Sequence, residues 1–250
     1  MDRAPHIIIE PNANRLHNTV AQHLQTLVEQ AAAEGRAFTL ALAGGSTPRG
    51  LYQCLAAPPF DRLIAWQTVK IFFGDERTVA PDHPDSNYRM AKEALLDKVA
   101  IAPDRIYRMQ GDHIDPVQSA RDYAEHVERE VAKHDDGWPC FDLVLLGLGP
   151  DGHIASLFPN TAILDVEDQT VAAVHVPQHD TWRISLTYPV VNHAKHLWLL
   201  ATGESKANIA AQILDPANTN RYPAQRLAPL GEYRWYLDVA SASQIALQEQ

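Results

Sequence analysis

Short runs of apolar residues with no polar alternation recur along the chain and predict strands that are buried on both faces. The run that ends in Leu145-Leu146-Gly147 is the most uniform of them. Such strands are typical of a parallel sheet with helices on both sides. The expected strands cover residues 7–9, 38–43, 69–73, 141–146, 171–176, 183–186, 197–201 and 235–239, of which 171–176 and 183–186 have the weaker pattern.

Between these strands, apolar residues recur at spacings of three and four, which is the period of an amphipathic helix. One such stripe runs from Leu16 to Ala31 and predicts a long helix that ends near Gly35. Asp115-Pro116 predicts another helix start, because Asp is a good N-cap and Pro suits the first helical position. Two further helices are expected, at about 86–99 and from 206 to about 214.

Strands that alternate with helices in this way predict an α/β fold with a largely parallel sheet flanked by helices on both faces. The sequence has no internal repeat, no low-complexity tract and no Gly/Ser-rich linker. We therefore expect a single domain over residues 1–250.

The composition restricts the class of partner. The chain has 250 residues and a formal net charge of −10, which argues against nucleic-acid and anionic-membrane partners because both need a cationic face. Cys54 and Cys140 give neither a disulfide framework nor a zinc spacing. The apolar run near the start has only three residues, too short for the core of a signal peptide, and no stretch approaches the length of a membrane span. We expect a cytoplasmic, soluble protein, monomeric or at most a weak dimer, in which a local group of basic residues binds any anionic ligand.

The segment Gly44-Gly45-Ser46-Thr47-Pro48 follows a predicted strand and has three interpretations. A serine nucleophile would need the elbow GxSxG, but Pro48 stands where that motif has its second glycine. In the second interpretation, backbone N–H groups and the Ser46 and Thr47 hydroxyls hold an anion at the start of a helix whose first residue is Pro48. The third is a tight turn with a helix cap and no ligand.

Basic residues near other strand ends favour the anion site. Lys206 lies at the start of the helix after 197–201, where the helix dipole disfavours a cation by about 0.3–1 kcal/mol. An anion between Lys206 and the helix would relieve this, whereas the alternative is a lysine that points into solvent. A third strand, at 69–73, is followed by the charged residues Asp75, Glu76 and Arg77. Such a charge run is usually a solvated loop. However, this is the third strand end with polar residues, and all three are expected at the same edge of the sheet.

The loop after strand 141–146 matches GxGxxG, the dinucleotide-binding motif, at 147–152. That motif requires a helix directly after it and an acidic residue at the end of the next strand. Pro159 leaves space for only about two helical turns, and the next predicted strand ends in His175-Val176-Pro177. We therefore do not expect a nicotinamide cofactor.

The same loop contains Asp151 and His153. Asp151 can hold one ring nitrogen of His153 while the other faces a substrate, and Gly152 would let that substrate approach closely; this is the arrangement that a general base needs. The alternative is that Asp151 caps a short helix from Gly152 and His153 packs in its first turn. The histidine pairs 175/179 and 193/196 match no recognised ligand spacing, so we expect no metal.

Taken together, these segments resemble the 6-phosphogluconolactonase family, and the resemblance extends over nearly the whole chain. The segments that carry it are LALAGGSTPRG (40–50), FGDER (73–77), SNY (86–88), LLGLGPDGHIASLFPN (145–160), RISL (183–186), TGESKA (202–207) and residues 235–238. The resemblance implies the α/β fold shared with glucosamine-6-phosphate deaminase and ribose-5-phosphate isomerase. It also implies hydrolysis of 6-phospho-D-glucono-1,5-lactone in the oxidative pentose phosphate pathway, without a metal or an organic cofactor.

The resemblance assigns residues as well. It implies that His153 is the catalytic histidine, that Asp151 is its partner, and that a phosphosugar pocket is formed by the remaining matched positions. Those positions are Gly44, Gly45, Ser46, Thr47, Arg77, Gly152, Arg183 and Lys206.

Two other functions share part of this pattern. Glucosamine-6-phosphate deaminases resemble the chain at GGSTP and DGHIA, but they continue as GHIAFNEPG and have DEY after the second strand, where this chain reads HIASLFP and Asp75-Glu76-Arg77. A sugar-phosphate sensor without turnover is the third possibility; such sensors carry a DNA-reading domain, for which 250 residues leave no space. Both comparisons favour the lactonase.

Overall fold

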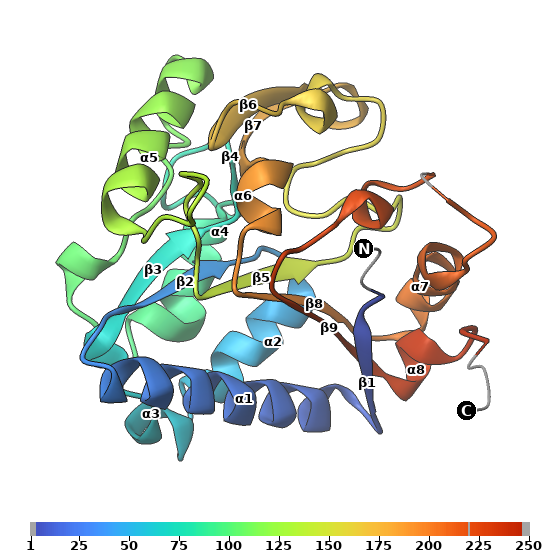
Figure 1. The fold of residues 1–250 in the computed structure, drawn as a ribbon, viewed down its shortest axis with the longest axis horizontal. Helices are drawn as coiled ribbons and strands as arrows, with labels where there is room; N and C mark the ends of the chain where they lie inside the picture. Colours follow the sequence, from blue (N-terminus) through green and yellow to red (C-terminus); the bar gives the residue numbers. More distant parts are fainter. Residues whose placement is uncertain (1–3, 220, 247–250) are drawn as a thin grey trace.

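Six parallel strands form the central sheet, in the order β1-β9-β8-β5-β2-β3 (Figure 1). The computed structural model describes residues 4–219 and 221–246. The strand order changes direction between β2 and β5, because β3 follows β2 on one side while β8 and β9 follow β5 on the other. The strands are β1 (His6–Glu10), β2 (Phe38–Leu42), β3 (Val69–Phe73), β5 (Leu143–Gly147), β8 (His196–Ala201) and β9 (Glu232–Asp238).

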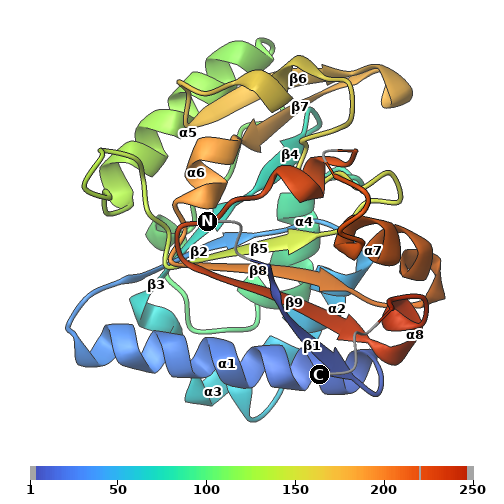
Figure 2. The ribbon, with the colours of Figure 1, turned by 45° about the vertical axis from the view of Figure 1, so that its right-hand side comes forward.

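Helices cover both faces of this sheet (Figures 1 and 2). One face packs against α1 (Ala13–Ala33), α2 (Ser46–Leu55), α3 (Phe60–Leu63) and α4 (Asn87–Ala91), which continues into the π-helical turn Lys92–Leu96. The other face packs against α5 (Pro116–Glu130), α6 (Tyr188–Asn192), α7 (Ala207–Leu214) and α8 (Val239–Ala242). Short 3₁₀ turns lie at Trp66–Thr68, Pro103–Arg105, Ala162–Asp165, Pro177–His179, Glu204–Lys206 and Pro223–Arg226.

The two hydrophobic cores are separated by the sheet itself. Leu143 and Leu145 of β5 pack with α1 and α2, whereas Val144 and Leu146 pack with α5 and α6. Successive side chains of a strand point to opposite faces, so a strand between two helical layers needs apolar residues at every position. The prediction of a parallel sheet covered on both sides is confirmed.

A second, smaller sheet was not predicted. It has the antiparallel order β4-β7-β6, formed by β4 (Asp75–Arg77), β7 (Thr181–Leu186) and β6 (Val171–Val176). The alternative of a solvated loop at 75–77 does not hold, because these residues form β4. Gly74 connects the two sheets: its N–H donates to the carbonyl of Leu42, and its carbonyl accepts the N–H of Leu186.

Two predicted helix details also change. The helix α2 begins at Ser46, so Pro48 is its third residue and not its first. Residues 151–160 contain no helix, and Asp151 therefore caps none. The N-cap at Asp115 is confirmed, because its carboxylate accepts the N–H groups of Val117 and Gln118. Among the described residues, no helix is long and apolar enough to cross a membrane.

Two buried tyrosines fix the ends of β2 and β3. The hydroxyl of Tyr52 accepts the N–H of Ala43 at 2.9 Å and donates to the carbonyl of Ala43 at 2.8 Å. The hydroxyl of Tyr123 does the same for Phe73, at 2.8 Å and 3.3 Å. Burial raises the pKa of both phenols, so both stay protonated and keep donating. These bonds satisfy backbone groups at the points where the strands end.

We predict that Tyr52→Phe destabilises the protein by about 1–3 kcal/mol, because it leaves buried backbone groups of Ala43 without a partner. Urea denaturation followed by circular dichroism measures this. Tyr88→Phe is the control, since no hydrogen bond of the Tyr88 hydroxyl is found among the described residues. Equal midpoints for the two variants would contradict the assigned contribution of Tyr52.

Candidate active site

A cavity of about 230 Å³ lies at the carboxyl ends of β2, β3, β5 and β8. This is the edge at which parallel α/β sheets bind ligands, next to the point where the strand order changes direction. Eight of the ten residues proposed from the sequence line it. They are Gly44, Gly45, Ser46, Thr47, Arg77, His153, Arg183 and Lys206.

His153 and Asp151 form a hydrogen-bonded pair in the loop after β5. Nδ1 of His153 lies 2.5 Å from a carboxylate oxygen of Asp151, which also accepts the backbone N–H of His153 at 3.2 Å. Burial alone would raise the pKa of Asp151, but the hydrogen bonds and the charge of His153 outweigh it, and the pKa lies below its usual range. An ionised Asp151 assigns the proton to Nδ1, which leaves Nε2 as the free ring nitrogen.

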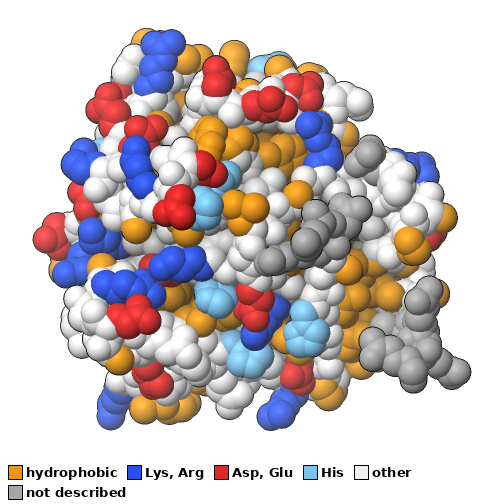
Figure 3. Space-filling model, in the orientation of Figure 1, with side chains coloured by type: hydrophobic (Ala, Val, Ile, Leu, Met, Phe, Trp, Pro, Cys, Tyr) orange, Lys and Arg blue, Asp and Glu red, His pale blue; other side chains and the backbone are white. Residues whose placement is uncertain are grey.

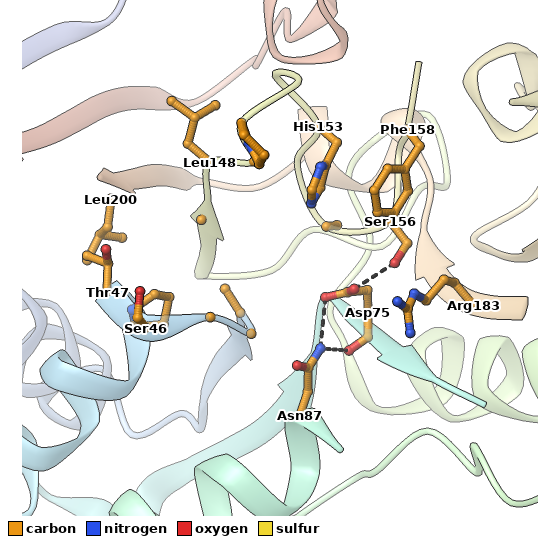
Figure 4. A pocket seen from close by; sticks show the side chains of 18 of the residues that line it. Ser46, Thr47, Asp75, Asn87, Leu148, His153, Ser156, Phe158, Arg183 and Leu200 are labelled. Carbon is orange, nitrogen blue, oxygen red and sulfur yellow. Dashed lines mark hydrogen bonds between the residues drawn. The ribbon is translucent and has the colours of Figure 1, made fainter. Parts of the chain in front are cut away.

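Phe158 and Gly149 restrict the position of the His153 ring. The ring stacks on Phe158 with 4.0 Å between centroids and 28° between planes. Figure 4 shows both side chains pointing from their loop into the cavity. A Cβ at Gly149 would come within 2.0 Å of the ring, so glycine at this position leaves the space that the ring occupies.

The structure does not place Gly152 at the cavity, in contrast to the prediction. Its φ of +74° requires glycine, and a Cβ there would lie 2.8 Å from the side chain of Tyr222. Its carbonyl accepts the N–H of Ala224. Gly152 thus allows the close approach of the loop that contains Tyr222.

The cavity wall carries three cations, from β4, from β7 and from the turn after β8. Arg77 and Arg183 are direct cross-strand partners on β4 and β7, and Lys206 is the N-cap residue of α7. Within residues 4–219 and 221–246, no carboxylate lies within ion-pair distance of any of them. Like charges directly opposite each other in a sheet are destabilising.

Burial lowers the pKa of two of these cations, Arg183 and Lys206. Burial, followed by the positive charge of Arg77, lowers the pKa of Arg183. Burial also lowers the pKa of Lys206, which the negative charge of Asp151 offsets only in part. A bound anion would compensate all three charges, so the arrangement fits a phosphorylated ligand.

The start of α2 forms another part of the cavity wall. Thr47 is buried and its hydroxyl lies 2.8 Å from that of Thr202 in the loop after β8, while Ser46 is exposed toward the cavity. The first N–H groups of a helix have no acceptor within the helix and can bind an anion. Among the described residues, the hydrogen-bond partner of the His153 ring is Asp151 and not Ser46, which disfavours the serine-nucleophile interpretation.

Sequence reasoning missed a polar cluster on the cavity floor. Asp75 is buried, and its carboxylate accepts the Ser156 hydroxyl at 2.6 Å and the Asn87 amide at 3.1 Å (Figure 4). Asn87 also donates to the backbone carbonyl of Asp75, and Gly44 lies against the Asn87 side chain. The charge run at 75–77 was the available signal, but the sequence does not show that Asp75 contacts Asn87 and Ser156.

Glu76 stabilises the backbone that carries this cluster. This buried carboxylate accepts the backbone N–H groups of Arg77, Asn87 and Tyr88 and the hydroxyl of Ser86. Burial raises its pKa in spite of these bonds. Glu76 therefore holds the start of α4 against β4, and with it the positions of Asn87 and Arg77.

Comparison with known proteins gives a consistent result. A family model described as glucosamine-6-phosphate isomerases/6-phosphogluconolactonase matches residues 11–235. A 6-phosphogluconolactonase of Nostoc sp. is 38% identical to this chain over 225 residues, which is 90% of each protein. The solved structure of 6-phosphogluconolactonase from Trypanosoma cruzi is 28% identical and covers 98% of both chains, with a TM-score of 0.86. A monomeric glucosamine-6-phosphate deaminase, 20% identical with a TM-score of 0.81 over 96% of this chain, shares the fold.

We predict that Arg183→Ala weakens the binding of inorganic phosphate about tenfold, because a charge-assisted hydrogen bond contributes on the order of 1.5–3 kcal/mol. Isothermal titration calorimetry at fixed ionic strength measures the affinity. Arg62→Ala is the matched control, since Arg62 is 86% exposed and pairs only with Asp61. If both variants bind phosphate like the wild type, the anion site does not include Arg183.

Proposed function

We propose that this chain, which belongs to the family of glucosamine-6-phosphate isomerases and 6-phosphogluconolactonases, hydrolyses 6-phospho-D-glucono-1,5-lactone to 6-phosphogluconate in the oxidative pentose phosphate pathway. The observation that carries the proposal is the His153–Asp151 pair, which presents a free imidazole nitrogen to a cavity with three cations that form no ion pair within the described part of the chain. The active unit is a single domain, 1–250.

In the proposed mechanism, neutral His153 removes a proton from water through Nε2. The water oxygen attacks the lactone carbonyl carbon, and its carbonyl oxygen becomes an oxyanion. When the tetrahedral intermediate collapses, the bond from the carbonyl carbon to the ring oxygen breaks, and the imidazolium returns its proton to the leaving hydroxyl. The products are a carboxylic acid and an alcohol, so no covalent intermediate, metal or organic cofactor enters the scheme.

Asp151 acts as a positioning residue in this scheme. Its carboxylate fixes the Nδ1–H tautomer and stabilises the imidazolium that forms during attack. Burial would raise the pKa of Asp151, but the hydrogen bonds and the charge of His153 hold it below its usual range, which favours the charged carboxylate. His153 and Asp151 thus work as one unit.

Arg77, Arg183 and Lys206 bind the phosphate or the developing oxyanion. Arg77 and Arg183 come from the small sheet and lie together, which suits two contacts to one phosphate. Lys206 follows β8, and the negative charge of Asp151 acts on it, which supports a position closer to the reacting carbonyl. Backbone N–H groups at Gly44, Gly45, Ser46 and Thr47 add donors at the opposite wall.

One chain supplies every residue in this scheme, so we propose that the protein acts as a monomer. We also propose that it acts in the cytoplasm.

The competing activity, deamination of glucosamine-6-phosphate, uses the same fold. Fresh phosphogluconolactone assayed for acid release against the spontaneous rate tests the first activity, and ammonia release from glucosamine-6-phosphate tests the second. Ammonia release without acceleration of lactone hydrolysis would replace the proposal.

We predict that His153→Ala lowers kcat by about 10²–10⁴-fold with the thermal unfolding midpoint nearly unchanged, because general-base catalysis contributes that range. The coupled lactone assay measures the rate, and circular dichroism measures folding. His113→Ala is the control, since the His113 ring bonds to Asp115 at the start of α5, away from the cavity. Near-normal turnover of the His153 variant would remove the imidazole from the reaction.

We predict that Lys206→Ala lowers kcat, whereas Arg183→Ala chiefly raises KM. Loss of an interaction that is made only in the transition state lowers kcat, which we expect for Lys206. Loss of an interaction that is equally strong in the substrate complex and in the transition state raises KM, which we expect for Arg183. Steady-state kinetics over a range of substrate concentrations separates the two. A pure KM effect for Lys206→Ala would assign Lys206 to the phosphate.

A further inference from the structure

A second group of chemically active side chains lies on the other side of the molecule from the cavity. His134 and Asp136 belong to the loop between α5 and β5, and His193 is the C-cap residue of α6, which leads into β8. These positions are at the amino ends of β5 and β8, whereas the cavity is at the carboxyl ends. The spacing of these residues in the sequence gives no hint of the cluster, because 57 residues separate Asp136 from His193.

The three side chains converge on one point. Asp136 directs one carboxylate oxygen to Nε2 of His193 at 2.8 Å and the other to Nδ1 of His134 at 3.1 Å. One ligand atom from each of the three lies within 4.8 Å of the others. Ligand atoms of a tetrahedral zinc site are about 3.3 Å apart, given bonds of about 2.0 Å, so a small closure of the exposed loop would complete the geometry.

The tautomer of His193 makes a bound cation favourable. Nδ1 of His193 is hydrogen-bonded to the backbone carbonyl of Pro189, which can only accept, so Nδ1 carries the proton. In the neutral ring, Nε2 then presents a lone pair to a carboxylate oxygen of Asp136 at 2.8 Å. Two acceptors at that distance need either a proton or a metal ion between them, so the same contact suits an imidazolium that donates to Asp136 and a histidine that binds a metal ion. A backbone carbonyl behind the second ring nitrogen is also the usual support of a metal-ligating histidine.

The loop is held in this shape without any ligand. The N–H of His134 donates to the carbonyl of Trp138, and the N–H of Gly137 donates to the carbonyl of His134. The N–H of Trp138 donates to Asp136, and the Trp138 ring lies over the His193 ring at 5.9 Å and 27°. His193 is mostly covered, with 13% of its side chain exposed, while His134 and Asp136 are open to solvent. A metal could therefore enter from solvent.

We propose that His134, Asp136 and His193 bind one divalent transition-metal ion, with water at the fourth position. Two imidazoles and one carboxylate suit Zn²⁺, Ni²⁺ or Cu²⁺, whereas Mg²⁺ and Ca²⁺ prefer oxygen ligands alone. The ion joins the loop 133–140 to the end of α6. Because this point is remote from the cavity, the ion stabilises the fold and takes no part in the chemistry.

The surface around this group supports binding of a single ion and not of a large charged partner. Figure 3 shows acidic, basic and histidine side chains intermixed on the face that carries α5 and α6, with no continuous area of one sign.

The test uses the full chain after removal of metals with a chelator. Titration with Zn²⁺ in a calorimeter should give one site per chain, and His134→Ala and His193→Ala should each weaken it by about tenfold or more. Saturating Zn²⁺ should raise the unfolding midpoint of the wild type by about 5 °C or more, and the same Zn²⁺ concentration should raise that of the His134 variant by clearly less. His175→Ala is the control, because His175 lies beside a single aspartate, Asp180, at 3.4 Å.

Two outcomes overturn the proposal. Absence of one-to-one binding would show that the group is a hydrogen-bonded ion-pair network only. Binding that persists in the variant with both His134→Ala and His193→Ala would place the metal elsewhere. The visible spectrum of bound Co²⁺ distinguishes imidazole ligands from the thiolates of Cys54 and Cys140, and a thiolate spectrum would also contradict the assignment.

Discussion

The common direction of the six central strands is the constraint on which the rest of the structure depends. Since every strand pair of the main sheet is parallel, the loops after β2, β3, β5 and β8 all begin at one edge. The change of direction between β2 and β5 separates the helices that follow them to opposite faces. A cavity lined by residues far apart in the sequence results, without any one loop being long enough to enclose it.

The site is assembled from interactions of two kinds. Asp151 and His153 come from one loop, and their hydrogen bond needs only local geometry, together with the space beside Gly149. Arg77 and Arg183 are brought together by the pairing of β4 with β7, which is a long-range contact. Gly74 links the two sheets, because its backbone forms hydrogen bonds to Leu42 of β2 and to Leu186 of β7. The position of the cations relative to the imidazole is therefore set by the backbone and not by flexible side chains alone.

The sequence predicted the central sheet well because its strands are apolar at every position. It predicted neither β4 nor the separate small sheet, because three charged residues have no apolar period and the pairing partners lie about a hundred residues away. It identified the residues of the cavity that belong to recognisable motifs, yet it placed Gly152 there, since the sequence does not show that Tyr222 takes the space beside it. Asp75 and Ser156 were missed because their role depends on a contact between two distant loops.

The division of the cavity between two sheets has a consequence for selectivity. The imidazole lies in the loop after β5 of the main sheet, and the paired guanidinium groups lie on the small sheet. Under the proposed assignment, the spacing of the two sheets therefore sets the length of ligand that can contact both. A sugar lactone that lacks a phosphate, or carries it on a nearer carbon, would reach one end and leave the other empty. Discrimination among metabolites then follows from the span of the scaffold, and altering it calls for changes in strand register more than for new side chains.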